Sequence, residues 1–132
     1  MAEFSGKNVL ITGAALGAWV RWGLSLRFNP MFASLPLGTL AANLIGAYLI
    51  GIALAAIVEG NLLSTTSKLF IVTGFLGGLT TFSSFSGEVV TAIMRGQYGW
   101  AAAAIIGHVG GSLVATVAGM ASWSPLRRVA GI

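Results

Sequence analysis

The sequence predicts an all-α integral membrane protein with four transmembrane helices and a break in the third. Apolar residues make up 56% of the 132 residues and charged residues only 8%, whereas roughly a quarter of a soluble domain is charged. So few charges cannot cover a surface that faces water, and we expect a lipid bilayer around the chain. Charged and turn-forming residues divide the sequence into four apolar stretches, each long enough to cross a hydrocarbon core about 30 Å thick. We expect one domain, residues 1–132.

The four spans are expected at residues 8–26, 37–58, 68–94 and 98–121. The first has the outline of a signal peptide. Gly13 and Gly17, however, have the spacing that lets membrane helices pack closely, so we expect a retained helix. Pro36 suits the first turn of the second helix. Glu59-Gly60-Asn61 should end that helix, and residues 123–128 should form a tail at the membrane interface.

The short loops make neighbouring helices antiparallel and place both termini on one side of the membrane. Basic residues stand on both sides: Lys7, Lys68, Arg127 and Arg128 on the terminal side, and Arg27 and Arg95 on the other, joined by Arg21 if it snorkels. This is a weak positive-inside bias. The chain can insert in either orientation, or only with cytoplasmic termini, and the bias does not separate these alternatives. Four thin helices enclose little interior, so we expect a homo-oligomer.

The third span is longer than a membrane requires. Residues 69–94 as one continuous helix would extend about 39 Å at about 1.5 Å per residue, against a hydrocarbon core of about 30 Å. The surplus allows an interruption, which we expect at Gly77-Gly78. Non-helical backbone at membrane depth survives only when it is buried in protein or lines a polar cavity. The segment therefore predicts a site for an ion or a small solute.

Two phenylalanines, several hydroxyls and a carboxylate follow these glycines. Phe82 and Phe85 share a helix face and alternate with serines and threonines. Because the edge of an aromatic ring carries partial positive charge, ring edges and hydroxyl donors along a narrow path would favour a small anion. Glu88 lies one turn after Ser84, so it can accept a hydrogen bond from that hydroxyl. As an ionisable residue near membrane depth, Glu88 is a functional candidate.

Polar residues also occur in the second span. Asn43 shares a helix face with Thr39 and Gly46. A buried Asn can contact a ligand or simply join two helices. Both interpretations stay open.

The fourth span carries a stripe of His108, Ser112 and Thr116, four residues apart. We expect the Thr116 hydroxyl to bond to the carbonyl four residues earlier, and His108 to be a neutral imidazole bonded to a partner. In the first span Arg21 is either functional, because charge inside a membrane is costly, or an anchor that snorkels to the interface.

Other classes of function are disfavoured. The chain has no cysteine and one histidine, which excludes disulfides and thiol catalysis and makes a side-chain metal centre improbable. Its net charge of +4 suits helix anchoring to headgroups, and no basic patch with interleaved aromatics points to nucleic acid. An intramembrane hydrolase using Ser83 or Ser84 with His108 lacks the Gly-x-Ser-Gly elbow. We expect no enzyme.

Several segments together resemble the Fluc (CrcB) family of fluoride channels. The resemblance covers nearly the whole chain, and the segment after Val72 is the most specific. It rests on Gly17-Ala18-Trp19-Val20-Arg21-Trp22, Arg27-Phe28-Asn29-Pro30, residues 36–46 (PLGTLAANLIG) and residues 74–86 (GFLGGLTTFSSFS).

The resemblance implies a dual-topology antiparallel homodimer in the inner (plasma) membrane, with two fluoride pores and passive fluoride export. It also implies a central structural Na⁺, held by the backbone carbonyls of Gly77 and Thr80. Carbonyls freed by an unwound turn suit a hard cation.

The resemblance further implies roles for single residues. The ring edges of Phe82 and Phe85 would contact fluoride, and Asn43 would lie in the pore. The implied remainder of the path is Ser83 and Ser84 oriented by Glu88, then Ser112 and Thr116, with Arg21 near the aqueous vestibule. His108 departs from the Asn or Ser that family members often carry, and it stays a pore-adjacent candidate.

A small dual-topology multidrug antiporter is the competing function. Such a protein needs a carboxylate at mid-membrane in its first helix to exchange protons for cations, but residues 8–26 contain only Arg21 as an ionisable group. A purely structural membrane subunit would leave the hydroxyls of the third span unexplained.

Overall fold

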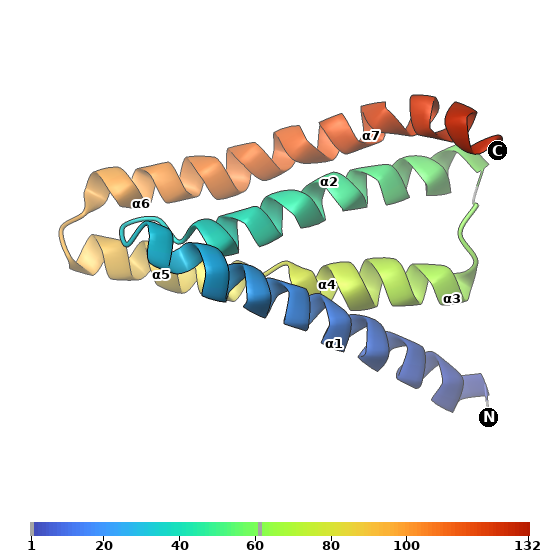
Figure 1. Ribbon diagram of the computed structural model, residues 1–132, viewed down its shortest axis with the longest axis horizontal. Helices are drawn as coiled ribbons and strands as arrows, with labels where there is room; N and C mark the ends of the chain where they lie inside the picture. Colours follow the sequence, from blue (N-terminus) through green and yellow to red (C-terminus); the bar gives the residue numbers. More distant parts are fainter. Residues whose placement is uncertain (1, 61) are drawn as a thin grey trace.

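The computed structural model describes residues 2–60 and 62–132. Its four long helices cross back and forth, and both termini lie at one end of the molecule (Figure 1). Each is long and apolar enough to cross a membrane: Ser5–Met31, Leu37–Gly60, Thr65–Met94 and Tyr98–Ala130. The expected four-span, all-helical architecture is confirmed. Asn61, part of the expected end of the second helix, lies outside the described residues.

The first two spans are nearly regular, and the last two are divided into shorter elements. The elements are α1 (Ala2–Phe28), η1 (Asn29–Met31), α2 (Leu37–Gly60), α3 (Thr65–Lys68), η2 (Leu69–Leu76), α4 (Gly77–Leu79), α5 (Phe82–Met94), α6 (Tyr98–Ile105), η3 (Ile106–Gly110) and α7 (Gly111–Ala130). Both η2 and η3 are π-helical, a conformation that is frequent at functional sites.

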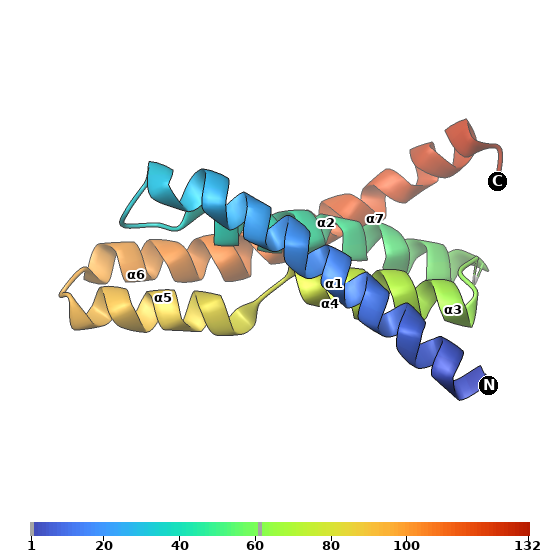
Figure 2. The same ribbon diagram turned by 60° about the horizontal axis from the view of Figure 1, so that its bottom comes forward.

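Two close helix pairs organise the bundle. α2 runs beside α7, and α1 crosses η2 and α4 (Figures 1 and 2). Glycines allow both approaches: a Cβ on Gly17 would collide with the Phe75 carbonyl, and one on Gly51 with the Thr116 carbonyl. Small residues at such crossings let membrane helices touch backbone to backbone.

The third helix is broken, but not where the glycines suggested. Gly77 and Gly78 are helical, and the extended residues are Thr80 (φ −84°, ψ 152°) and Thr81 (φ −149°, ψ 118°). A Cβ on Gly78 would collide with the Ala14 carbonyl, so this glycine serves helix packing. Thr81 caps the new helix, because its Oγ1 accepts the Ser84 N–H at 3.2 Å. The expected position at Gly77-Gly78 was therefore wrong by three residues.

The C-terminal tail is also more regular than expected. α7 continues through Pro125 to Ala130 and ends at Gly131 in the left-handed conformation. Trp123 Nε1 donates to Glu59 Oε2 at 3.0 Å, and Arg127 forms an ion pair with the same carboxylate oxygen at 3.4 Å. These contacts tie the last turns of α7 to the end of α2.

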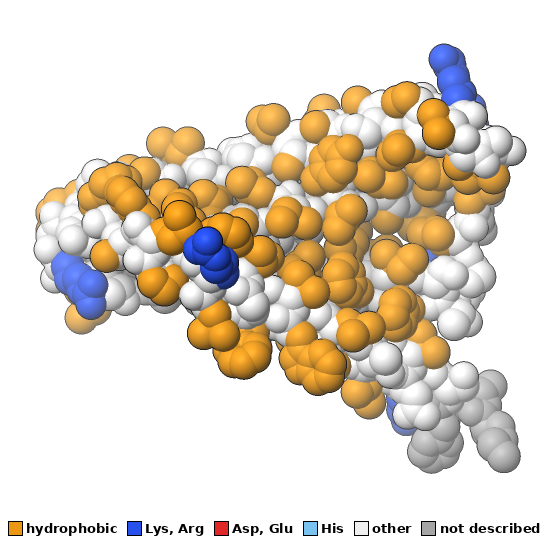
Figure 3. Space-filling model, in the orientation of Figure 1, with side chains coloured by type: hydrophobic (Ala, Val, Ile, Leu, Met, Phe, Trp, Pro, Cys, Tyr) orange, Lys and Arg blue, Asp and Glu red, His pale blue; other side chains and the backbone are white. Residues whose placement is uncertain are grey.

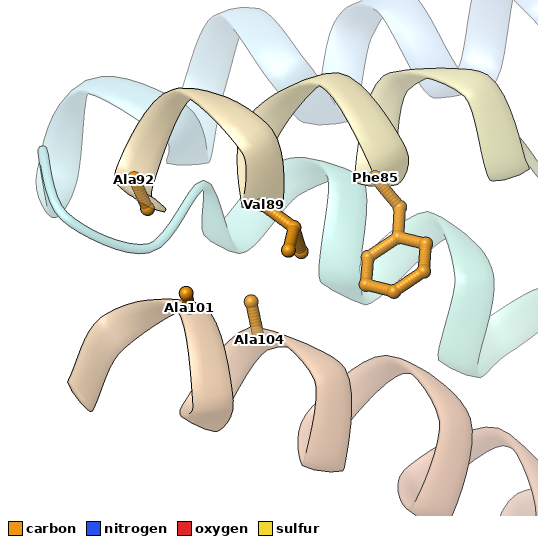
Figure 4. Close-up of a cluster of buried hydrophobic side chains, with 5 residues drawn as sticks. All are labelled: Phe85, Val89, Ala92, Ala101 and Ala104. Atoms are coloured by element: carbon orange, nitrogen blue, oxygen red, sulfur yellow. The ribbon is translucent and has the colours of Figure 1, made fainter. Parts of the chain in front are cut away.

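A small core joins the second half of the third span to α6. Phe85, Val89 and Ala92 point from α5 toward Ala101 and Ala104 of α6 (Figure 4). The outer surface is different: hydrophobic side chains extend along the whole visible face, with few Lys and Arg side chains (Figure 3). Such a surface fits a lipid environment.

Candidate functional site

The break in the third helix opens onto a pocket between α2, the third span and α7. Its volume is about 520 Å³, comparable to pockets that hold drug-sized ligands. The residues of functional interest that line it are Asn43, Thr80, Thr81, Phe82, Phe85, His108, Ser112 and Thr116.

Asn43 holds the broken backbone in place. Its Oδ1 accepts the Thr81 N–H at 2.7 Å, and its Nδ2 donates to the Thr81 carbonyl at 3.0 Å. The same nitrogen lies 2.9 Å from His108 Nδ1. One amide thus satisfies both backbone groups of an extended residue at membrane depth, as the absence of water there requires.

Three aromatic rings in contact line one part of the pocket. Phe82 and Phe85 meet edge to face, with ring centroids 5.4 Å apart and an interplanar angle of 68°. Phe85 stacks on His108 at 4.6 Å and 30°. Phe85 is 7% exposed, whereas Phe82 is 76% exposed. The structure therefore brings both expected phenylalanines to the pocket and leaves the outer one uncovered by its own chain.

The hydroxyls after the break pair differently from the expectation. Thr81 Oγ1 donates to Ser84 Oγ at 3.1 Å and lies 3.3 Å from Ser83 Oγ. Glu88 Oε1 accepts from Thr39 Oγ1 of α2 at 2.6 Å. Among the described residues the expected Ser84–Glu88 bond does not form: Thr39 is the donor to Glu88, and Ser84 Oγ accepts from Thr81. Ser83, Ser84 and Glu88 lie outside the residues that line the pocket.

The polar stripe of the fourth span does reach the pocket. His108 is carried by η3, and Ser112 and Thr116 by α7. Thr116 Oγ1 bonds to the Ser112 carbonyl at 2.9 Å, as expected, and to the Ala47 carbonyl of α2 at 3.1 Å. His108 has the expected partner, Asn43.

Arg21 reaches the break rather than the pocket. Its Nε donates to the Gly78 carbonyl at 3.0 Å, and the interaction is partly buried. This guanidinium therefore stabilises the last turn before the break, which neither of the two sequence interpretations described.

The break also leaves the carbonyls of Gly77 and Thr80 without their helical donors. The Thr81 N–H would normally bond to the Gly77 carbonyl, but it bonds to Asn43 instead. The Ser84 N–H would normally bond to the Thr80 carbonyl, but it bonds to Thr81 Oγ1. Within the described part of the chain, no cluster of three His, Cys, Asp or Glu side chains could hold a metal ion. Carbonyl oxygens are ligands of the kind that hard cations prefer.

Two residues matter more than the sequence suggested. Thr39 was placed on the Asn43 face without a partner, and Thr81 was only one of several hydroxyls. The structure shows that Thr39 binds Glu88 and that Thr81 is both the N-cap and the partner of Asn43. The shared face of Thr39 and Asn43 was the available signal, since both side chains contact the same half of the third span.

A family profile and several individual relatives place the chain in the same family. The profile of a family described as "CrcB-like protein, Camphor Resistance (CrcB)" matches residues 8–120. A protein of Chromobacterium violaceum is 58% identical over 116 residues, covering 88% of this chain and 92% of its own length. One of Nitrosospira multiformis is 56% identical over 108 residues, covering 82% and 84%, and one of Dechloromonas aromatica is 52% identical over 120 residues, covering 89% of each. All three are named "Fluoride-specific ion channel FluC".

Proposed function

The chain belongs to the CrcB-like family, and we propose that it is a fluoride-selective channel through which the ion leaves the cell down its electrochemical gradient. The observation that carries this proposal is the broken third helix, whose two phenyl rings and polar neighbours line a pocket at membrane depth. The identity of the ion as fluoride comes from the names of the relatives. The protein is then a multi-pass protein of the inner (plasma) membrane, and it is not an enzyme.

Selection of fluoride over chloride follows from size and hydration. Fluoride holds water tightly, so a pore must replace that shell with short donors, yet bind weakly enough at each site for the ion to leave. Phe82 and Phe85 would offer the ion their ring edges, which carry partial positive charge, without a fixed cation that would trap it. Hydroxyl and N–H donors complete the set.

We further propose that two antiparallel copies form the working channel, with two pores. The pocket of one chain, at about 520 Å³, has far more volume than a bare halide fills, and Phe82, which lines it, is 76% exposed. Polar groups at membrane depth need protein or water around them, and a second copy would cover them and narrow the path. The weak charge bias between the two sides agrees with dual topology.

A structural Na⁺ at the break fits the chemistry of this chain. The carbonyls of Gly77 and Thr80 have lost their helical donors, and hard cations take oxygen ligands. Two copies crossing at their breaks would offer four such oxygens. The bound ion would supply positive charge and hold the copies together, while Asn43 and Arg21 keep the broken backbone in shape.

Ser83, Ser84 and Glu88 would form the path beyond the rings, with Thr39 as the partner that orients the Glu88 carboxylate. Arg21 would lie near the aqueous vestibule. Asn43, Ser112 and Thr116 belong to the pocket itself. The alternative of a cation/proton antiporter finds no support in the comparisons.

The proposal is tested with purified protein in lipid vesicles. Vesicles loaded with potassium fluoride should release fluoride to an external electrode when valinomycin balances the charge, and vesicles loaded with potassium chloride should retain chloride. Equal release of both ions, or no fluoride release beyond protein-free vesicles, would contradict the proposal.

A further inference from the structure

Most polar side chains that line the pocket already donate their protons to other groups of the protein. Asn43 has none, because one N–H of its amide goes to the Thr81 carbonyl and the other to His108 Nδ1. Thr80 Oγ1 donates to the Leu76 carbonyl at 2.8 Å, and Thr81 Oγ1 donates to Ser84. Thr116 gives its hydroxyl proton to backbone carbonyls. Four of the six polar side chains that line the pocket are therefore committed elsewhere.

The contact with Asn43 fixes the tautomer of His108. An amide nitrogen only donates, so Nδ1 of the ring must accept. Asn43 cannot turn its oxygen toward the ring, because both ends of the amide are engaged by the backbone of Thr81. The ring is therefore neutral, and its single proton lies on Nε2.

The Nε2–H of His108 is a buried donor without a hydrogen-bond partner among the described residues. His108 is 4% exposed. A buried donor without a partner costs about 1–3 kcal/mol, so native proteins rarely retain one. The π-helical turn Ile106–Gly110 places the ring here, stacked on Phe85, one helical turn before Ser112.

Ser112 is the second donor that remains. Its hydroxyl has no protein partner in the described part of the chain, while its carbonyl accepts from Thr116. His108 and Ser112 follow each other at i and i+4, so they share one face. Both line the pocket beside Phe85.

We propose that the Nε2–H of His108, together with the Ser112 hydroxyl, binds the anion in this pocket, and that Asn43 is a positioning residue that holds the imidazole in the donating tautomer. This rests on the proposed channel function for the identity of the anion as fluoride.

The first test observes the tautomer and the binding directly, without transport. His108 is the only histidine of the chain, so protein labelled with ¹⁵N-histidine gives one imidazole in an NMR spectrum. We expect a protonated Nε2 and an unprotonated Nδ1, with the Nε2 signal shifting on addition of sodium fluoride but not sodium chloride. A proton on Nδ1, or an Nε2 signal that fluoride leaves unmoved, would overturn the proposal.

Asn43→Asp tests the positioning role with the same signal. A carboxylate cannot donate to Nδ1, so the imidazole proton should move from Nε2 to Nδ1. The apparent affinity for fluoride, measured from the shift of the signal, should then fall at least about tenfold. Ser122→Ala is the control, because Ser122 bonds to Tyr48 away from the pocket and should leave both tautomer and affinity unchanged. An unchanged tautomer in Asn43→Asp would overturn the positioning role.

Fluoride efflux measurements distinguish a failure of the proposed role of His108 from a failure of the channel function. His108→Phe keeps an aromatic ring against Phe85 but removes the donor, and we expect fluoride efflux to fall about tenfold or more. His108→Gln restores an N–H at nearly the same reach and should recover most of the rate. If wild-type protein does not release fluoride, the channel function fails. If wild type and His108→Phe release it equally fast, only the proposed role of His108 fails.

Discussion

The two halves of the third span are held by different means. Before the break, η2 and α4 pack against α1 through backbone contacts at glycines, such as Gly17 against the Phe75 carbonyl. After it, α5 is held by side chains: Phe85 in the small core with α6 and Thr81 in the cap. In the first half the glycine contacts leave no room for a side chain. In the second half polar and aromatic side chains line the pocket. We infer that the packing of η2 and α4 against α1 fixes the position of the break, and that this places the start of α5 at the pocket.

The largest expected effect is on the half before the break. Gly17→Leu should prevent folding, because the new side chain would meet the backbone of Phe75 and Leu79, which cannot move aside. The cost should exceed the about 1–3 kcal/mol of ordinary overpacking. Size-exclusion chromatography should show aggregated or absent protein. Gly23→Leu, in the same helix and with open space around it, should give a monodisperse peak; equal behaviour of the two variants would refute the glycine contact.

The junction between the halves should be next. Asn43→Ala leaves the N–H and carbonyl of Thr81 and the Nδ1 of His108 without their partner. Unpaired buried groups cost about 1–3 kcal/mol each, so the melting temperature in detergent should fall clearly. A melting temperature equal to that of wild type would mean that the amide does not hold the break.

A smaller difference should separate the two phenylalanines. Phe85→Ile should lower the melting temperature more than Phe82→Ile does. Phe85 is 7% exposed and packs on Val89 and His108 of its own chain, whereas Phe82 is 76% exposed there and only a second copy would cover it. We expect about 1–2 kcal/mol for the buried position, the scale of a shape change in a packed core. Equal destabilisation would indicate that Phe82 is buried in an assembly to the same extent as Phe85.

The smallest effect concerns the end of α7, far from the break. Trp123→Phe removes the hydrogen bond to Glu59 but keeps an aromatic ring against Ala55 and Ala56. A hydrogen bond to a charged group is worth about 1.5–3 kcal/mol at most, and the partly exposed position should reduce this further. The melting temperature should fall slightly with fluoride efflux unchanged, and a loss of efflux would link this end of the molecule to the pore.

The sequence was informative where composition and spacing determine structure. Too few charges and four apolar stretches predicted the four spans, and the surplus length of the third predicted its break. The position of the break was not predictable from glycine alone, because glycine both interrupts helices and allows close packing. The contact of Gly78 with Ala14 decides between these uses, and it depends on the tertiary structure.

The site was predicted as a set of residues but not as a set of interactions. Phe82, Phe85, Asn43, Ser112 and Thr116 all reach the pocket. The partner of Glu88 is Thr39 rather than Ser84, because the neighbouring helix α2 places the Thr39 hydroxyl 2.6 Å from that carboxylate. Pairings between spans depend on how helices are rotated, and periodicity within one span does not define that rotation.

The most direct test of the central claim is fluoride efflux from vesicles that contain Phe82→Ile. We propose that the ring edges after the break line the ion path, so this variant should remain folded, with a wild-type elution volume, and release fluoride at least about tenfold more slowly, as expected when a favourable contact with the ion is lost. Release at the wild-type rate from a folded Phe82→Ile protein would contradict the account.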